Sequence, residues 1–219
     1  MPVEQLVPYC FFLSIKGILA FSLLALIFIF IKKMSSKYKF RDQDELYFVT
    51  FAVVCWIDLF TRNVYKDIML NSWRHCQSKK GMELYGWCIM SSHIHMIIGS
   101  QKDRLEDIMR DMKKFTSSEL KKEIKNCPYE SRREWMLQIM EETGKLNKQN
   151  KDFQLWQQDN HPVPLTTMTI AHQKLDYIHN NPVEAGIVGK PEDYLYSSAR
   201  DYYGTGGLTD IILLDPLIK

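Results

Sequence analysis

Apolar residues along the chain form two kinds of pattern that alternate. Continuous or every-second-residue apolar runs predict strands, and apolar residues every three or four positions predict helices. Residues 44–56 are rich in β-branched and aromatic side chains and favour a buried strand. Residues 62–79 place their apolar side chains at helical spacing, and Gly81 follows as the expected C-terminal cap. Residues 82–89 and 93–98 are again strand-like and lie a short turn apart, so we expect an antiparallel hairpin.

The second half of the chain continues the pattern less regularly. Residues 103–125 carry an apolar stripe at helical spacing, and residues 153–157 alternate as a strand does. Residues 166–180 predict a further helix that stops at Asn181, because the residue before a proline disfavours the helical region. The predicted order of strand, helix, two strands, helix and strand is that of a split β-α-β arrangement in an α+β fold.

The first 33 residues differ in composition from the rest and predict an N-terminal hydrophobic helix. Residues 11–31 carry one charge and are long enough to span a bilayer, which takes roughly 20 residues. Met34 also looks like an ordinary start, so residues 1–33 are either a transmembrane anchor or a spurious extension. We expect one further domain at 34–219, in a cytoplasmic, nucleoid-associated protein that is membrane-anchored only if residues 11–31 are a real anchor.

Composition adds few constraints. The five cysteines are odd in number and scattered, which favours reduced, buried thiols rather than disulfides or a zinc finger. The formal net charge is only +2. The first 33 residues hold three lysines and one glutamate, so the remainder has as many acidic as basic residues. Net charge therefore gives no support for nucleic-acid binding, and any DNA-binding face must come from local clustering.

A pair of histidines lies in the apolar strand IMSSHIHMIIG. Side chains at positions i and i+2 of a strand share one face, so His93 and His95 project side by side while Ile94 enters the other face. Imidazole nitrogens commonly bind divalent metals. A lone pair of this kind is more often a chance feature of a half-exposed sheet, and two ligands are too few to fix a metal.

A tyrosine and an asparagine share a turn of the helix HQKLDYIHNNPVEAGIV. Tyr177 and Asn181 are four residues apart, so they share a helix face if the helix persists that far, and Gln173 lies one turn earlier. A hydroxyl nucleophile and an amide ligand could thus dock together beside the histidine strand. Most of the eleven tyrosines are expected to be packing residues, and Asn181-Pro182 could be only a helix stop.

Taken together, the two segments resemble single-tyrosine HUH transposases. IMSSHIHMIIG is similar to their His-hydrophobe-His strand. YIHNNPVEAGIV, the more specific segment, resembles the tyrosine helix of the REP-associated tyrosine transposases. DELYFVTF, DMKKFTSSELKK and YLYSSARDYYG resemble other segments of that family in the same order. The similarity extends from residue 34 to about residue 204.

The resemblance implies a ferredoxin-like fold with a central antiparallel sheet, a divalent metal (Mg²⁺ or Mn²⁺), and single-stranded DNA hairpins from repetitive elements as substrate. It implies that His93 and His95 are metal ligands and that Tyr177 is the catalytic nucleophile, which forms a 5′-phosphotyrosine link. Asn181 occupies the place where related transposases carry a glutamine ligand. This departure leaves the third ligand open between Asn181 and Gln173.

Four lysines on the second long helix are candidate DNA-binding residues: Lys113, Lys114, Lys121 and Lys122. They could contact phosphates without reading sequence. Acidic residues are interspersed among them, so an ordinary solvated helix face is an equal alternative.

Three other functions fit parts of the sequence. One is a catalytically silent protein of the same fold that binds DNA hairpins. Another is a membrane-anchored protein whose histidines are structural or bind zinc. The third is a relaxase or replication initiator, which shares the chemistry. The sequence leaves open whether the protein forms a homodimer, and whether Tyr177 serves its own subunit or a partner.

Overall fold

A computed structural model describes residues 40–147, 152–158 and 160–215. All of these belong to one compact unit, Lys39–Lys219. The predicted N-terminal hydrophobic helix, interpreted above as either a transmembrane anchor or a spurious extension, lies outside the described residues. Within the described part, no helix is both long and apolar enough to cross a membrane.

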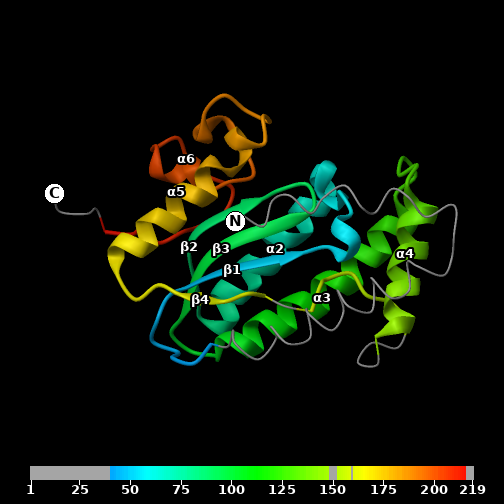
Figure 1. Ribbon diagram of the computed structural model, residues 1–219, viewed down its shortest axis with the longest axis horizontal. Helices are drawn as coiled ribbons and strands as arrows, with labels where there is room; N and C mark the ends of the chain where they lie inside the picture. The colour runs from blue at the N-terminus through cyan, green and yellow to red at the C-terminus, as the bar shows by residue number, and fades with distance from the viewer. Residues whose placement is uncertain (1–39, 148–151, 159, 216–219) are drawn as a thin grey trace, which may run out of the picture. The chain divides into compact units, whose positions relative to one another are not determined.

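The core of the fold is a four-stranded antiparallel sheet with the strand order β2-β3-β1-β4. Its strands are β1 (Tyr47–Ala52), β2 (Met82–Ile89), β3 (His93–Ser100) and β4 (Val163–Pro164). Strands β2 and β3 form the predicted hairpin, and β3 pairs with β1 at the centre of the sheet (Figure 1). This order and these connections are those of a ferredoxin-like fold, so the predicted fold class is confirmed.

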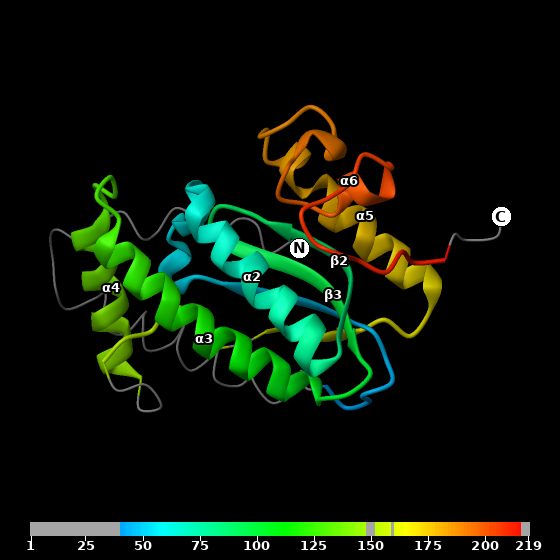
Figure 2. The same ribbon diagram turned by 180° about the vertical axis from the view of Figure 1, so that it is seen from behind.

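Two long helices cover one face of the sheet. They are α2 (Asn63–Lys80) and α3 (Leu105–Asn126), which lie side by side in front of the strands in Figure 2. Helix α2 ends at Gly81, whose φ of 69° is the left-handed conformation that glycine adopts at little cost. The rings of Trp73 and Trp87 meet edge to face at 5.3 Å, which locks α2 against β2.

The opposite face is crossed by α5 (Met168–Glu184). The helix approaches β2 closely at Gly86, where an added Cβ would lie 2.6 Å from Leu175 Cδ1. Leu175 and Ile178 are buried beneath the helix and hold it on the sheet. The remaining elements are short or peripheral: η3 (Val54–Trp56), η4 (Leu59–Thr61), α4 (Arg133–Leu146), η5 (Pro191–Asp193) and α6 (Ala199–Tyr202).

The prediction of a strand at residues 153–157 is wrong. Trp156 makes only an isolated bridge to Val53. The fourth strand is β4, which begins at Val163, ten residues after Phe153. Gln154 and Trp156 are both buried, as is Leu155 between them, so the polar–apolar alternation does not correspond to two faces of a strand. The indole nitrogen of Trp156 donates to Thr116 on α3, which fixes the segment over the helix layer instead.

The predicted end of the tyrosine helix is also wrong, because α5 continues through Pro182 to Glu184. A proline in the last turn removes only one donor, and the carbonyl groups around it still accept hydrogen bonds from beyond the helix. Ile187 N donates to Pro182 O and Gly186 N donates to Val183 O, which is the pattern of a Schellman cap. Gly186, with φ 69°, therefore ends the helix, and Asn181 lies within it.

Candidate functional site

The two histidines lie where the strand pattern places them, on the sheet face crossed by α5. Their ring centroids are 4.7 Å apart. His95 Nδ1 is 2.7 Å from Thr50 Oγ1 on the neighbouring strand, and His93 Nδ1 is 3.2 Å from Ser92 Oγ. When each Nδ1–H donates to its hydroxyl, both Nε2 lone pairs remain for a ligand, as in many histidine metal sites.

Both imidazoles are kept neutral by their surroundings. Burial lowers the pKa of His95 to about 3, and the nearby charges of His93 and Lys174 act in the same direction. Burial also lowers the pKa of His93 to about 4, against a smaller opposing effect of Asp58. The neutral form is the one that binds metals, so the pair is in the right protonation state at neutral pH.

Helix α5 places Tyr177 directly over the histidine face. Its ring lies edge to face with His95 at 5.2 Å and with Phe48 at 6.0 Å, and 37% of the residue is exposed. Lys174, one turn earlier, has its ammonium 4.8 Å from the Phe48 ring centroid and 5.6 Å from that of Tyr177. The phenol is thus accessible, close to the imidazoles and beside a cation.

Asn181 joins the same site because α5 persists past it. Its Nδ2 is 3.4 Å from His95 Nε2. Rotating the amide about its Cβ–Cγ bond exchanges Nδ2 with the carbonyl oxygen, which is a ligand for hard divalent metals. Gln173, the reserve candidate, has an exposed side chain. Of the two, the geometry brings Asn181 to the histidines.

The donor set fits a divalent metal only if an amide takes part. Among the described residues, no three His, Cys, Asp or Glu side chains gather in a group that could hold a metal ion. Two neutral imidazoles and one amide oxygen are nonetheless compatible with Mg²⁺ or Mn²⁺, with the other positions left to water and phosphate oxygens.

The predicted DNA-binding lysines lie on α3, in the layer on the other side of the sheet from α5. Lys113 Nζ donates to Gln157 O and to Asn160 Oδ1, both at 2.8 Å, so it links α3 to the segment that precedes β4. Lys121 lies 4.2 Å from the Phe153 ring centroid. Lys114 and Lys122 are exposed. The structure therefore does not bring this cluster together with the histidines and Tyr177.

Three residues at the site were not predicted from the sequence: Phe48, Thr50 and Lys174. Only Lys174 had a signal that the sequence alone could show. Phe48 and Thr50 alternate on β1, opposite the histidine strand, and only the register Thr50↔His95 reveals which face they share. Lys174 precedes Tyr177 by three residues, a helical spacing that puts both on one side of α5.

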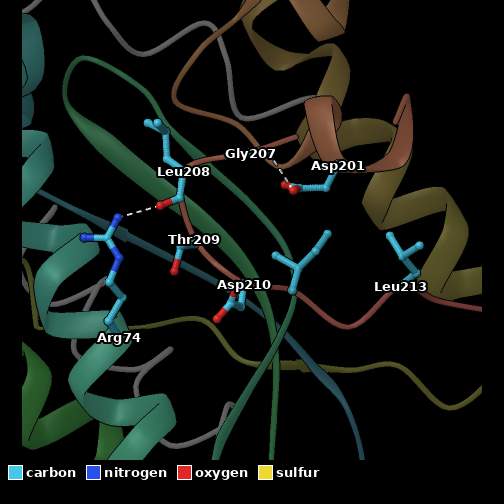
Figure 3. A pocket seen from close by; sticks show the side chains of 8 residues that line it. Arg74, Asp201, Gly207, Leu208, Thr209, Asp210 and Leu213 are labelled. Atoms are coloured by element: carbon cyan, nitrogen blue, oxygen red, sulfur yellow. Dashed lines mark hydrogen bonds between the residues drawn. The ribbon is translucent and has the colours of Figure 1, made fainter. Parts of the chain in front are cut away.

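A separate hollow of about 450 Å³ lies between α2 and the C-terminal segment (Figure 3). Arg74 donates to Leu208 O there, and Gly207 N donates to Asp201 Oδ1 at 2.8 Å. None of the residues that line it is one of the predicted site residues. The candidate chemistry therefore lies at the histidine face and not in this hollow.

Comparison with known proteins agrees with this reading. Residues 47–140 match the family described as "Transposase IS200 like". Among solved structures, the chain is similar to one described as "Structure of the REP associates tyrosine transposase bound to a REP hairpin". The TM-score is 0.57 and the identity 18%, over 85% of this chain and 100% of that chain. No curated protein matches.

The family match contains both histidines and ends before α5, whereas the structural similarity extends over most of the chain. Both comparisons agree with the resemblance inferred from the two motifs. Residues 47–140 are similar to the IS200-like transposases, and the chain has the fold of a REP-associated tyrosine transposase.

Proposed function

We propose that the protein is a transposase that cuts and rejoins single-stranded DNA through a covalent link to Tyr177. The observation that carries the proposal is the convergence of three side chains from two elements. Tyr177 lies against His95, and Asn181 reaches the same imidazole from the next turn of α5. A nucleophile, two neutral imidazoles and an amide within one small site match the needs of phosphodiester transfer.

The reaction exchanges one ester for another. The Tyr177 oxygen forms a bond to the scissile phosphorus, while the bond from phosphorus to the DNA 3′-oxygen breaks. The phenolic proton passes to solvent or a nearby base, and the departing 3′-oxygen takes up a proton. The product is a 5′-phosphotyrosine and a free 3′-hydroxyl. Because the ester energy is retained, a 3′-hydroxyl can reverse the step on the same or a new strand.

The chain's own residues prepare this step. Thr50 orients His95, and the buried pair stays neutral. Lys174 places a positive charge next to the phenol, where it can attract the phosphate. His93, His95 and Asn181 are the residues that would hold Mg²⁺ or Mn²⁺. Such a metal, when bound, withdraws charge from the scissile phosphate.

The substrate we propose is a single-stranded hairpin from a repetitive element. The similar solved structure is described as bound to a REP hairpin, and this chain shares its fold. The balanced charge of residues 34–219 fits a protein that recognises a folded shape at a few places better than one that binds any strand by charge alone.

The direct test is incubation with Mn²⁺ and single-stranded oligonucleotides that span genomic palindromic repeats. We expect a covalent protein–DNA complex that survives denaturing electrophoresis, with the adduct on Tyr177 by mass spectrometry. Tyr177→Phe should abolish the complex and leave binding close to wild type. Tyr203→Phe, at another exposed tyrosine, is the matched control. An adduct of normal yield in Tyr177→Phe, or binding without any adduct in the wild type, would contradict the proposal.

A further inference from the structure

An exposed tryptophan lies at the rim of the histidine pair. Trp56 is 54% exposed, and its ring lies edge to face with that of His93, with the centroids 5.4 Å apart. Single exposed aromatic rings are common on protein surfaces, but this one lies against a candidate metal ligand. The position of the ring, more than its exposure, connects it to the site.

The backbone holds the ring there at a conformational cost. Cys55 and Trp56 are two successive non-glycine residues with positive φ, 53° and 54°. Each such residue costs on the order of 1 kcal/mol and persists only where the surroundings impose it. The pair belongs to η3, the short turn that follows β1, so the strand predicted to reach residue 56 stops at Ala52.

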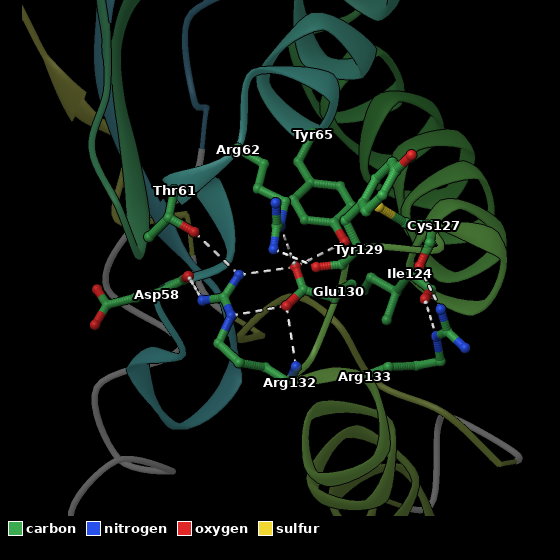
Figure 4. A network of polar contacts seen from close by, with 10 residues as sticks. All are labelled: Asp58, Thr61, Arg62, Tyr65, Ile124, Cys127, Tyr129, Glu130, Arg132 and Arg133. Atoms are coloured by element: carbon green, nitrogen blue, oxygen red, sulfur yellow. Dashed lines mark hydrogen bonds and ion pairs between the residues drawn. The ribbon is translucent and has the colours of Figure 1, made fainter.

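Both flanks of this turn are anchored. Before it, Val53 N donates to Ser92 O and Val54 N donates to Leu155 O. After it, Arg132 donates to Asp58 O at 2.7 Å, and its guanidinium is held in turn by buried Glu130 (Figure 4). These contacts hold the backbone on both sides of Trp56, which lowers the ordering cost upon binding.

The register shows that Trp56 and Tyr177 lie at opposite ends of the histidine pair. Along β1, Phe48 contacts Tyr177, Thr50 pairs with His95, and Ala52 pairs with His93. Trp56 follows beyond Ala52, next to His93. Tyr177, by contrast, contacts His95.

In a substitution at phosphorus, the leaving oxygen departs on the side opposite the nucleophile. With Tyr177 at the His95 end, we infer that the strand that leaves extends toward the His93 end, and that Trp56 is a stacking platform for the base of the nucleotide that leaves with the free 3′-hydroxyl. The inference rests on the proposed function. Stacking on one aromatic ring is tolerant of base identity, so this contact retains the released strand for rejoining and does not select a sequence.

The test compares Trp56→Ala, Trp56→Phe and the control Trp135→Ala, which removes another exposed tryptophan (44%) on α4. The probe is the repeat-derived oligonucleotide of the adduct experiment. In a Tyr177→Phe background, Trp56→Ala should weaken binding about 5- to 150-fold. Trp56→Phe should recover part of the affinity, and Trp135→Ala should bind normally. Equal affinities for Trp56→Ala and Trp135→Ala would overturn the inference.

The yield of rejoined product distinguishes stacking by Trp56 from a purely structural role of this residue. With Tyr177 intact, Trp56→Ala should accumulate adduct and lose rejoined product, and excess strand with a 3′-hydroxyl should restore rejoining. A 2-aminopurine base next to the released 3′-hydroxyl should be quenched only when Trp56 is present, and one on the nucleotide bonded to Tyr177 should not. The opposite pattern would overturn the assignment of the leaving strand. Absence of any adduct in the wild type would instead contradict the proposed function, and Trp56 stacking would still be decided by binding.

Discussion

The two faces of the sheet are formed by the same strands, but one is a buried packing surface and the other carries the candidate site. On β3, Ile94 and Met96 are fully buried beneath α2 and α3, while His93 and His95 point to the face crossed by α5. The first face is closed by two long helices and tryptophan rings. The second is covered in part by α5, and so keeps polar groups and an accessible phenol together.

The contrast shows how a strand of alternating side chains can carry stability and chemistry at once. A change at one position should affect the stability of the closed face, and a change at the next should affect the reaction on the open face. Substitutions at His95, Met96 and Thr50 test this division, and substitutions at Glu130 test the polar network outside the sheet. They are ordered by expected effect.

The largest effect is expected from His95→Ala on the open face. Changes to a residue that only orients a metal ligand typically cost about 10- to 100-fold in activity, so removal of a ligand should cost at least the upper end. Adduct yield against time gives the measurement. Met96→Leu is the matched control on the neighbouring position. A His95→Ala protein that forms adduct at the wild-type rate would refute the role of the pair.

Glu130→Ala should cost the most stability. This buried carboxylate accepts hydrogen bonds from Arg62, Arg132 and the Tyr65 hydroxyl (Figure 4). Removing it takes the charged partner from the partly exposed Arg62 and Arg132 and the acceptor from the buried Tyr65 hydroxyl. The loss of these hydrogen bonds to a charged group should cost about 3–5 kcal/mol in the free energy of unfolding. Denaturant titration measures this loss. A cost below about 1 kcal/mol would show that the network contributes little.

The same group predicts a dependence on pH. Burial raises the pKa of Glu130, but its hydrogen bonds with Arg132, Tyr65 and Arg62 outweigh burial and lower the pKa to about 2. The folded state therefore binds this proton less readily than the unfolded chain. Its stabilisation is present above about pH 4.5 and is lost progressively as pH falls toward 2. Glu130→Gln should flatten that part of the stability profile; an unchanged profile would assign acid unfolding to other groups.

Met96→Ala tests the closed face directly. The side chain is fully buried, so its loss should lower the free energy of unfolding by about 2–5 kcal/mol. The folded fraction should still form adduct, because the side chain points away from the site. If Met96→Ala abolished adduct formation while it stayed folded, the two faces would not be separable.

The smallest effect is expected from Thr50→Val, which keeps the shape of the side chain and removes its hydrogen bond to His95. Adduct formation should fall about 10- to 100-fold through loss of ring orientation. The change in unfolding free energy should be about 1 kcal/mol. Rescue by Thr50→Ser would attribute the effect to the hydroxyl; activity equal to wild type in Thr50→Val would remove Thr50 from the site.

Much of this architecture could be predicted from the sequence. The hairpin, α2 with its Gly81 cap and the shared face of His93 and His95 all follow from local rules that hold within a few residues. What failed depended on distant contacts. Trp156 is drawn to Thr116 on α3, and only the three-dimensional fold shows that its segment is not a strand.

The site followed the same division. The motifs predicted Tyr177 and the histidines correctly as neighbours in one site. The end of α5 was predicted too early, because a residue before proline usually ends a helix, whereas here the helix continues to the cap at Gly186. Thr50 and Trp56 could not be assigned to the site because their relation to the histidines depends on strand register and on a strained turn.

The continuity of α5 through Pro182 has one more consequence. Tyr177 and Asn181 lie on consecutive turns of one continuous helix, so a movement of α5 would move the proposed nucleophile and the proposed amide ligand together. Were two copies to exchange this helix, each reaction centre would combine the imidazoles of one copy with both groups of the other. Cutting would then require assembly, which would restrain an isolated copy from breaking DNA.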